Sequence, residues 1–391
     1  MNVYQRAVKL REETVNHRRY FHVHAEVGLN LPKTRAYVMQ TLRSYGLEPK
    51  ACGSGVTATI GKGGRTILLR ADMDALPIRE ESGEPFACTT GNAHACGHDF
   101  HAAMLLTAAK LLKEREDQLA GTVKLMFQPG EEVLLGARDM MENGLLDDPM
   151  PDAALAVHVC AGKEPPGMYM YNDTGALMAS VDGFRITIRG KGAHGAYPQA
   201  AIDPINIAVH VYLAMEDLIS REAEPEKMCI LSVGKFTAGS AWNVIPESAV
   251  LEGAVRTNDK ASRERLLRRL HEVAEKTAEV YDGTAQVEML CQVPPLTCDP
   301  GLMEEIVGYL EQSGIPQLRS QPGITANASE DFALIAERIP SAYLYLSAGF
   351  PDERGELLAH NPQVVFDEDV CPIGAACLVH CAESWLKAHK M

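Results

Sequence analysis

The sequence lacks a long apolar segment, a dense run of cysteines and a basic stripe, and each absence excludes a class of protein. No stretch approaches the roughly eighteen consecutive apolar residues from which a transmembrane helix is recognised. The polar start of the chain lacks the apolar core of a signal peptide. The net charge of −15 argues against a nucleic-acid partner, because nothing offsets phosphate repulsion. We therefore expect neither a membrane nor a nucleic acid as partner.

The ten cysteines are sparse and irregularly spaced over 391 residues, unlike the framework of a disulfide-rich secreted protein. We expect most of them to be buried, small apolar side chains in a reducing compartment, which predicts a cytoplasmic location. Cys96 is the exception because it lies within a cluster of His and Asp residues.

Short apolar runs alternate with helical segments in the first part of the chain. Residues 66–71, 122–127 and 153–159 are typical of buried strands, and 102–115 has the composition of a helix. Helices are also expected before and after a turn at residues 26–28. Polar residues follow the strands, which predicts an α/β fold with an open sheet and a site along one edge.

The pattern changes near residue 180, where apolar and polar residues begin to alternate. The following elements have the order β-α-β-β-α-β, which is typical of a ferredoxin-like unit. The chain then returns to α/β character, with a strand at 341–346 and a helix at 370–389. We therefore predict a first part of the catalytic domain at 1–180, an inserted domain at 181–292 and a second part at 293–391.

Five separate segments carry side chains that bind metals or transfer protons. Thiolate, imidazole and carboxylate groups are the usual ligands of zinc and related metals, so the set predicts a two-metal hydrolase. The segments are Arg70-Ala-Asp-Met-Asp-Ala-Leu-Pro77, His94-Ala-Cys-Gly-His-Asp-Phe-His101, Phe127-Gln-Pro-Gly-Glu-Glu132, Ala156-Val-His158 and Ala359-His-Asn-Pro362.

Each segment also has an ordinary explanation when it is taken alone. An isolated Cys-x-His or Glu-Glu pair is most often part of an exposed loop, and a lone His at the end of an apolar run is most often a core residue. Four potential ligands within six residues before a helix (Cys96, His98, Asp99 and His101) favour a metal site. Of the adjacent carboxylates, one could bind metal while the other faces a bound water. Asp72 or Asp74 could orient a ligating imidazole.

Taken together, these motifs resemble the M20 metallopeptidase family, in particular its N-acyl-amino-acid amidohydrolases, which include hippurate and auxin-conjugate hydrolases. The resemblance implies a metallopeptidase-like α/β catalytic domain with an inserted ferredoxin-like lid and dimerisation domain. It also implies that Glu131 is the general base and Asp74 a supporting acid. The implied ligands of two divalent metals are Cys96, His98, Glu132, His158 and His360.

The inserted region carries further matches to this family. His194, in Gly190-Lys-Gly-Ala-His-Gly-Ala-Tyr-Pro198, resembles a lid residue that polarises the scissile carbonyl, often across a dimer interface. Asn243 and Arg256 resemble residues that hold the substrate carboxylate, a task that suits an amide and a guanidinium. The resemblance therefore implies a homodimer or higher homo-oligomer. Three departures are Gly130, where Ala is common and a looser loop is expected, Phe100, where the family often has a small or polar residue, and the absence of a second His shortly after His360.

The expected reaction is hydrolysis of an N-acyl-amino acid to a carboxylic acid and a free amino acid, with Glu131 as the base. A Cys ligand favours zinc, and manganese, cobalt and nickel are alternatives. A metallo-dipeptidase is the main alternative enzyme, and a metal-binding scaffold without activity is the alternative from another class. Nucleotide binding by residues 61–64 is disfavoured because these glycines precede a strand.

Overall fold

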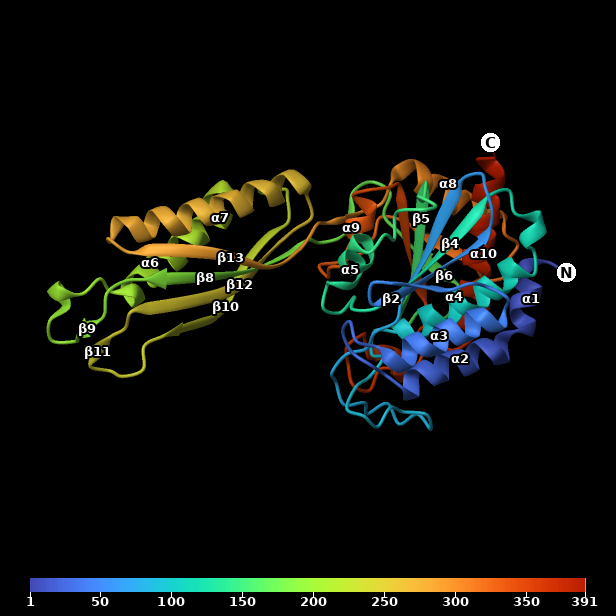
Figure 1. Cartoon of the computed structure of the whole chain (residues 1–391), viewed down its shortest axis with the longest axis horizontal. Coiled ribbons are helices and arrows are strands. Elements are labelled where there is room, and N and C mark those ends of the chain that lie inside the picture. The colour runs from blue at the N-terminus through green and yellow to red at the C-terminus, as the bar shows by residue number, and fades with distance from the viewer. Residues whose placement is uncertain (391) are drawn as a thin grey trace. The chain divides into compact units, whose positions relative to one another are not determined.

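The computed structural model describes residues 1–390, which form two compact units. The large unit comprises Met1–Thr174, Cys298–Ile324 and the chain from Leu334 onward. The inserted unit comprises Gly175–Thr297 and Thr325–Ala333. Each unit is built around a sheet of its own (Figure 1).

The large unit is centred on an eight-stranded sheet with the strand order β1-β2-β4-β3-β5-β16-β6-β15. Its middle is parallel: β3 (Thr66–Asp72) lies between β4 (Thr122–Gln128) and β5 (Ala153–Cys160), and β16 (Ser341–Ser347) follows β5. These strands are buried along nearly their whole length, as runs of Val, Ile, Leu and Ala predict. The four predicted strands are confirmed, and the carboxyl ends of all four meet at one edge of the sheet.

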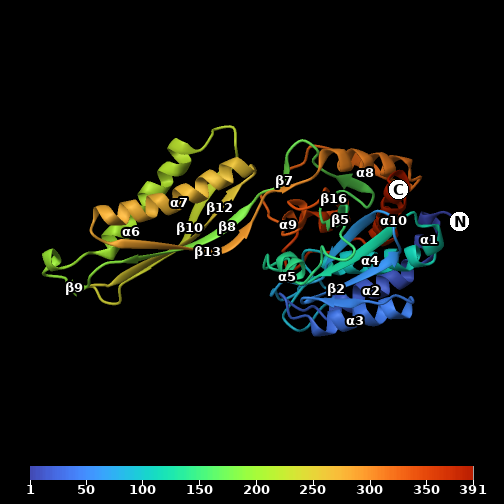
Figure 2. The same ribbon diagram turned by 45° about the horizontal axis from the view of Figure 1, so that its top comes forward.

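Helices cover this sheet in more than one layer. α4 (His98–Lys113) and α10 (Val370–Ala388) pack on β3, β5 and each other, and α2 (Arg11–Val23) packs along α4. Figures 1 and 2 show α2, α3 (Pro32–Ser44) and α4 side by side. α4 is buried over most of its length because its sequence is apolar on nearly every face.

The remaining elements are short or peripheral. They are α1 (Val3–Lys9), α5 (Gly136–Glu142), α8 (Pro300–Gln312), α9 (Ala333–Ala336), β1 (Lys50–Cys52), β2 (Gly55–Gly61), β6 (Met168–Met170), β7 (Ala176–Met178), β14 (Leu296–Thr297) and β15 (Arg319–Gln321).

Two helices differ from the sequence prediction. The first helix is interrupted at Leu10, so that α1 and α2 are separate. α4 begins at His98 rather than at Ala102. Gly97 has a φ of 86°, which ends the preceding turn, and Asp99 in the first turn complements the positive helix N-terminus. Residues 98–101 of the cluster at 96–101 are therefore helical.

The inserted unit contains a four-stranded antiparallel sheet with the order β10-β12-β8-β13. Helices α6 and α7 pack on it and enclose an apolar core that includes Phe184, Ile207 and Leu270. The chain order is the predicted β-α-β-β-α-β, which confirms the ferredoxin-like arrangement. The elements are β8 (Val181–Arg189), α6 (Pro204–Asp217), β10 (Cys229–Ala238), β12 (Ser248–Thr257), α7 (Lys260–Val280) and β13 (Thr284–Val293).

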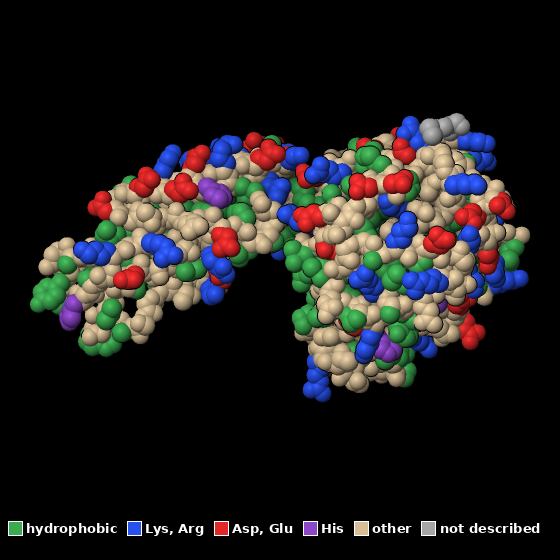
Figure 3. Space-filling view, in the orientation of Figure 1, with side chains coloured by type: hydrophobic (Ala, Val, Ile, Leu, Met, Phe, Trp, Pro, Cys, Tyr) green, Lys and Arg blue, Asp and Glu red, His purple; other side chains and the backbone are tan. Residues whose placement is uncertain are grey.

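α7 is strongly amphipathic. Its buried residues recur every four positions, at Leu266, Leu270, Ala274 and Ala278, and face the core of the inserted unit. Charged side chains of both signs line its outer face (Figure 3). A single apolar stripe therefore holds α7 against the sheet of the inserted unit.

A small ribbon extends from one end of the inserted unit's sheet. It pairs β9 (Ala193–His194) with β11 (Val244–Ile245), and Val244 lies opposite His194. The ribbon follows the end of β8 where Arg189 faces Ser248, whereas Arg256 faces Ile230 near the opposite end of β12. Figures 1 and 2 show β9 at the end of the inserted unit where β8 ends.

Two expectations from composition concern the chain as a whole. Within residues 1–390, none of the helices combines the length and the apolar character that a bilayer crossing needs. All ten cysteines are free, and six of them are buried, which confirms the prediction for most of them.

Candidate metal centre

The carboxyl ends of β3, β4 and β5 bring three of the predicted segments together. Asp74 follows β3, Glu131 and Glu132 follow β4, and His158 lies near the end of β5. His98 joins them from the first turn of α4. Parallel strands that lie next to one another end at the same edge, so this convergence follows from the sheet order.

Asp74 holds the two glutamates in place. It is fully buried, and its Oδ1 and Oδ2 atoms accept hydrogen bonds from the backbone N–H groups of Glu131 (3.0 Å) and Glu132 (3.2 Å). The preceding Gly130 has a φ of 64°, and a Cβ there would lie 2.7 Å from Leu29 Cδ2. The left-handed backbone and the nearby Leu29 side chain both favour glycine at this position.

His98 directs one ring nitrogen toward these carboxylates. Its Nδ1–H donates to the backbone carbonyl of Asp74 (3.0 Å), which leaves Nε2 as the ring nitrogen that faces the carboxylates. Nε2 is buried without a hydrogen-bond partner and lies 3.9 Å from both Glu131 Oε2 and Glu132 Oε1. This is the orientation that a metal-binding imidazole needs.

Cys96 and His158 form a second pair of donor atoms. His158 donates from Nδ1 to the carbonyl of Val159 (2.6 Å), and its Nε2 lies 3.6 Å from Cys96 Sγ. Burial holds the pKa of His158 well below its usual range. The Nε2 lone pair of a neutral imidazole therefore faces the thiol and can accept its hydrogen.

His360 approaches from a loop, and its Nε2 lies 3.7 Å from Glu132 Oε1. Its backbone is left-handed, with a φ of 68°, and 53% of its side chain is exposed. The ligand atoms of Cys96, Glu132 and His360 lie within 4.8 Å of one another, as do those of His98, Glu131 and Glu132. Two overlapping groups that share Glu132 are suited to two neighbouring cations.

Two other residues of the 94–101 segment do not turn toward this cluster. His101 Nδ1 contacts Asp72 Oδ1 (2.5 Å), and its Nε2 accepts from the backbone N–H of Val159 (2.8 Å). Asp99 turns toward α2 instead. His101 forms a candidate group with Asp72, His98 and His158, but both of its ring nitrogens already have partners. Cys96 and His98 therefore remain the candidate ligands from this segment.

Asp72 and Arg70 form a buried support beneath the cluster, and of these two, Asp72 but not Arg70 was singled out from the sequence. Arg70 Nη1 donates to Asp72 Oδ2 (2.6 Å) and Nε donates to Gln128 (2.9 Å), so β3 and β4 are joined where they end. Although burial alone would raise it, Arg70, His98 and His101 hold the pKa of Asp72 well below its usual range. An arginine within a buried strand was the available signal, since a buried guanidinium needs an anionic partner.

Comparison with known proteins agrees with this geometry. Residues 68–384 match the sequence profile of peptidase family M20/M25/M40. The chain belongs to this family. It is 36% identical over 367 residues to N-acetyl-L-cysteine deacetylase of Bacillus subtilis strain 168, which covers 92% of this chain and 85% of the deacetylase.

Two further relatives span almost the entire M20 chain. Hippurate hydrolase of Campylobacter jejuni is 31% identical over 397 residues, covering 99% of this chain and 100% of the hydrolase. The crystal structure of a dinuclear metal-binding M20 peptidase from Bacillus subtilis has a TM-score of 0.81 at 30% identity, covering 97% of this chain and 99% of the other. The predicted family and fold are confirmed, and this M20 protein is a metal-dependent amidohydrolase.

The donor atoms of this M20 protein fit a pair of divalent cations. His98 Nε2 and Glu132 Oε1 are both buried and lack hydrogen-bond partners among residues 1–390. Burial raises the pKa of Cys96 to about 12 and also raises that of Glu132. A bound dication would lower both pKa values and satisfy the unpartnered atoms.

The three predicted lid residues of this M20 protein lie in the inserted unit, and the unit does not bring all three together. His194 and Asn243 are exposed neighbours on the ribbon, where the N–H of Gly195 donates to the Asn243 carbonyl (2.8 Å). Arg256 lies toward the other end of β12, roughly 26 Å along the strand from Ser248 at about 3.3 Å per residue. Arg256 Nη1 donates there to Ser329 Oγ (2.9 Å).

The hydrogen bonds of His194 fix the role that its ring can play. The backbone N–H of Ala196 donates to His194 Nδ1 (3.1 Å), so the hydrogen of the neutral ring is on Nε2. His194 therefore presents a donor, as polarisation of a carbonyl requires.

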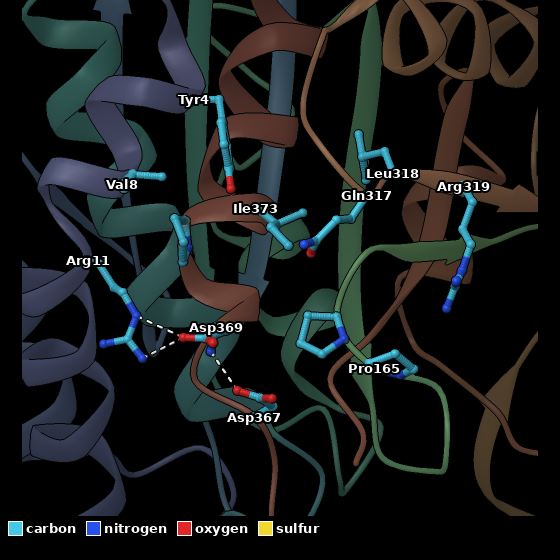
Figure 4. A pocket seen from close by; sticks show the side chains of 12 residues that line it. Tyr4, Val8, Arg11, Pro165, Gln317, Leu318, Arg319, Asp367, Asp369 and Ile373 are labelled. Carbon is cyan, nitrogen blue, oxygen red and sulfur yellow. Dashed lines mark hydrogen bonds and ion pairs between the residues drawn. The ribbon is translucent and has the colours of Figure 1, made fainter. Parts of the chain in front are cut away.

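A separate cavity of about 800 Å³ lies between the first helices, β15 and the start of α10 (Figure 4). Its arginines already have partners: Arg11 pairs with Asp369 (2.6 Å), and Arg319 pairs with Glu164 (3.0 Å). None of the predicted site residues lines this cavity. The cavity is therefore separate from the candidate metal centre.

Proposed function

We propose that this M20 amidohydrolase cleaves the amide bond of N-acyl-amino acids and releases a carboxylic acid and a free amino acid. The observation that carries the proposal is the Glu131–Glu132 pair, which Asp74 fixes beside the unpartnered Nε2 of His98. Relatives named N-acetyl-L-cysteine deacetylase and hippurate hydrolase support the substrate class.

Five residues would hold the two divalent cations. Zinc suits a donor set with a thiolate, and manganese, cobalt and nickel are the alternatives. When bound, the cations supply an activated water and polarise the substrate carbonyl. The ligands are Cys96, His98, Glu132, His158 and His360.

Glu131 is the proposed proton carrier. Its neighbour Glu132 turns one oxygen toward both His98 and His360, whereas Glu131 directs an oxygen toward His98. Glu131 therefore accepts the proton of the attacking water and later delivers it to the leaving nitrogen. Asp74 fixes the backbone of both glutamates by accepting hydrogen bonds from their N–H groups.

The inserted unit is the proposed lid. His194 donates from Nε2 to the oxyanion that forms when the carbonyl is attacked. Arg256 and Asn243 bind the substrate carboxylate, one as a charged fork and the other as an amide donor.

The positions of these residues favour a dimer. One N-acyl-amino acid is far shorter than β12, so the ribbon and Arg256 of one inserted unit cannot both contact the same substrate molecule. We therefore propose that each site uses Arg256 from one chain and the ribbon, with His194 and Asn243, from another. The working form is a homodimer or a higher homo-oligomer, and its free thiols suit the cytoplasm.

A hydrolysis panel tests the proposed substrate class. N-acetyl, N-benzoyl and N-long-acyl amino acids are compared with their carboxamides and with free dipeptides, using protein loaded with one defined metal at a time. We expect the N-acyl-amino acids to be cleaved and the carboxamides to react poorly. Dipeptides cleaved faster than every acylated substrate would establish a dipeptidase instead.

A further inference from the structure

A buried group of charges lies on the side of α4 that faces away from the ligands. Asp99, the second residue of α4, is fully buried, and its Oδ2 lies 2.8 Å from Arg18 Nε and 2.7 Å from His22 Nδ1. Arg18 and His22 are four residues apart on α2 and are buried as well. α2 and α4 lie side by side in Figures 1 and 2, so this group joins the two helices.

The charges in this group compensate one another. Burial lowers the pKa of His22, but its hydrogen bonds to Asp99 and Glu80 outweigh burial and raise it overall. Arg18 also donates from Nη1 to Glu368 at 3.0 Å, next to the start of α10. The guanidinium of Arg18 stacks over the Phe100 ring at 4.5 Å, so Phe100 packs against this group of charges.

The same group of charges also contacts the loop between Leu76 and Ala93, through His22 and Glu80. His22 Nε2 lies 2.9 Å from Glu80 Oε1, and Glu80 Oε2 accepts from the backbone N–H of Cys88 at 2.6 Å. The backbones of Leu76 and Ala93 pair with each other and close this loop. The side chain of Glu80 thereby anchors the loop to α2.

The anchored loop in turn holds the segment that carries His360. The N–H of Glu81 donates to the carbonyl of Pro362 (2.8 Å), and the N–H of His360 donates to the carbonyl of Ala95, next to Cys96 (2.8 Å). His360 has a left-handed backbone and a half-exposed side chain. A backbone of this kind persists only where its surroundings hold it.

We propose that Arg18 and His22 are positioning residues that set the geometry of the metal centre from behind α4. Through Asp99 they fix the helix turn that bears His98. Through Glu80 and its loop they fix His360 against Cys96. This role rests on the proposed metal ligands, and neither Arg18 nor His22 touches a ligand itself.

The chain provides a matched control in the neighbouring arginine. Arg19 donates to the same Glu368 at 3.0 and 2.7 Å and stacks over the same Phe86 ring as Arg18, at 4.5 Å compared with 4.8 Å. Its side chain is 45% exposed, whereas that of Arg18 is 4% exposed and contacts Asp99. Arg18→Lys and Arg19→Lys therefore differ in the link to Asp99.

Cobalt(II) binding to the full-length protein, after removal of other metals, tests the proposal. Arg18→Lys should weaken cobalt affinity about tenfold or more and shift the thiolate-to-cobalt absorption band, whereas Arg19→Lys should match the unmodified protein. Thermal unfolding of the metal-free variants records any general loss of stability. If Arg18→Lys lowers the melting temperature but has the spectrum and affinity of Arg19→Lys, Arg18 is a structural residue only.

A double-mutant cycle tests the connection to His360. His22→Gln should weaken cobalt binding in the unmodified protein and have a smaller effect in a His360→Ala background, because only the route through Asp99 to His98 then remains. An equal effect in both backgrounds would overturn this connection.

Cys96→Ser separates a failure of this proposal from a failure of the proposed ligands. Loss of the thiolate band in Cys96→Ser establishes the thiolate ligand, and the Arg18 and His22 variants then decide the positioning role. If the band survives in Cys96→Ser, the ligand assignment fails and the positioning role fails with it.

Discussion

The large unit and the inserted unit hold their candidate residues in opposite ways. In the large unit, Asp74 and His98 are fully buried and are fixed by hydrogen bonds to backbone groups. In the inserted unit, His194 and Asn243 are exposed on a two-stranded ribbon, next to a Trp242 side chain that is 97% exposed.

This difference separates a site that is preorganised from one that is assembled. Metal ligands must converge before the cation arrives, so burial and fixed ring orientation are useful to them. A residue that contacts only substrate, or that serves a neighbouring chain, can remain exposed until the complex forms. Substitutions of the metal ligands in the large unit should therefore alter metal content, and those in the inserted unit should alter kinetics alone.

The largest expected effect is on the glutamate pair. Glu131→Gln should reduce kcat by at least about a hundredfold with metal content retained, because the general base is lost. Glu132→Gln should lose metal, because this carboxylate faces both His98 and His360. Elemental analysis and steady-state kinetics of the two variants check this. Equal metal loss in both would mean that the two roles are wrongly assigned.

A smaller effect is expected in the inserted unit. Arg256→Ala should lower kcat/KM for an N-acyl-amino acid more than tenfold, since loss of a charged partner costs about 2 kcal/mol or more. The carboxamide analogue, which lacks the charge, should respond much less. Both substrates are measured on protein with full metal content. An equal loss for the two substrates would exclude a carboxylate contact.

The dimer proposal predicts a partial recovery of activity. His194→Ala and Glu131→Gln are each expected to be inactive, and equal mixing with subunit exchange should restore about a quarter of the activity, because half the dimers are mixed and half their sites are intact. Exchange is followed independently with differently tagged chains. If exchange is verified and no activity returns, His194 acts on the site of its own chain or has no part in the reaction.

Much of the fold could be predicted because the signals are local. The runs at 66–71, 122–127 and 153–159 and the alternation from residue 181 correspond to β3, β4, β5 and β8. The break at Leu10 and the hairpin of β1 and β2 were not predicted, because no marked change in composition accompanies them.

The ligand motifs were also visible in the sequence, but their supports were not. Asp99 and His101 looked like further ligands, and their turn toward α2 and Asp72 depends on partners distant in the sequence. The left-handed backbone of His360 likewise depends on contacts with Ala95 and with the loop of Glu81. Long-range contacts of this kind leave no periodic signal in one sequence.

The central claim is a two-metal hydrolytic site, and a metal titration with activity as the parallel readout tests it most directly. The protein is stripped with a strong chelator and titrated with zinc, manganese, cobalt or nickel, while bound metal and hydrolysis of an N-acyl-amino acid are followed together. We expect activity to vanish on stripping and to return as about two equivalents bind per chain. Full activity in protein without a bound transition metal would contradict the account.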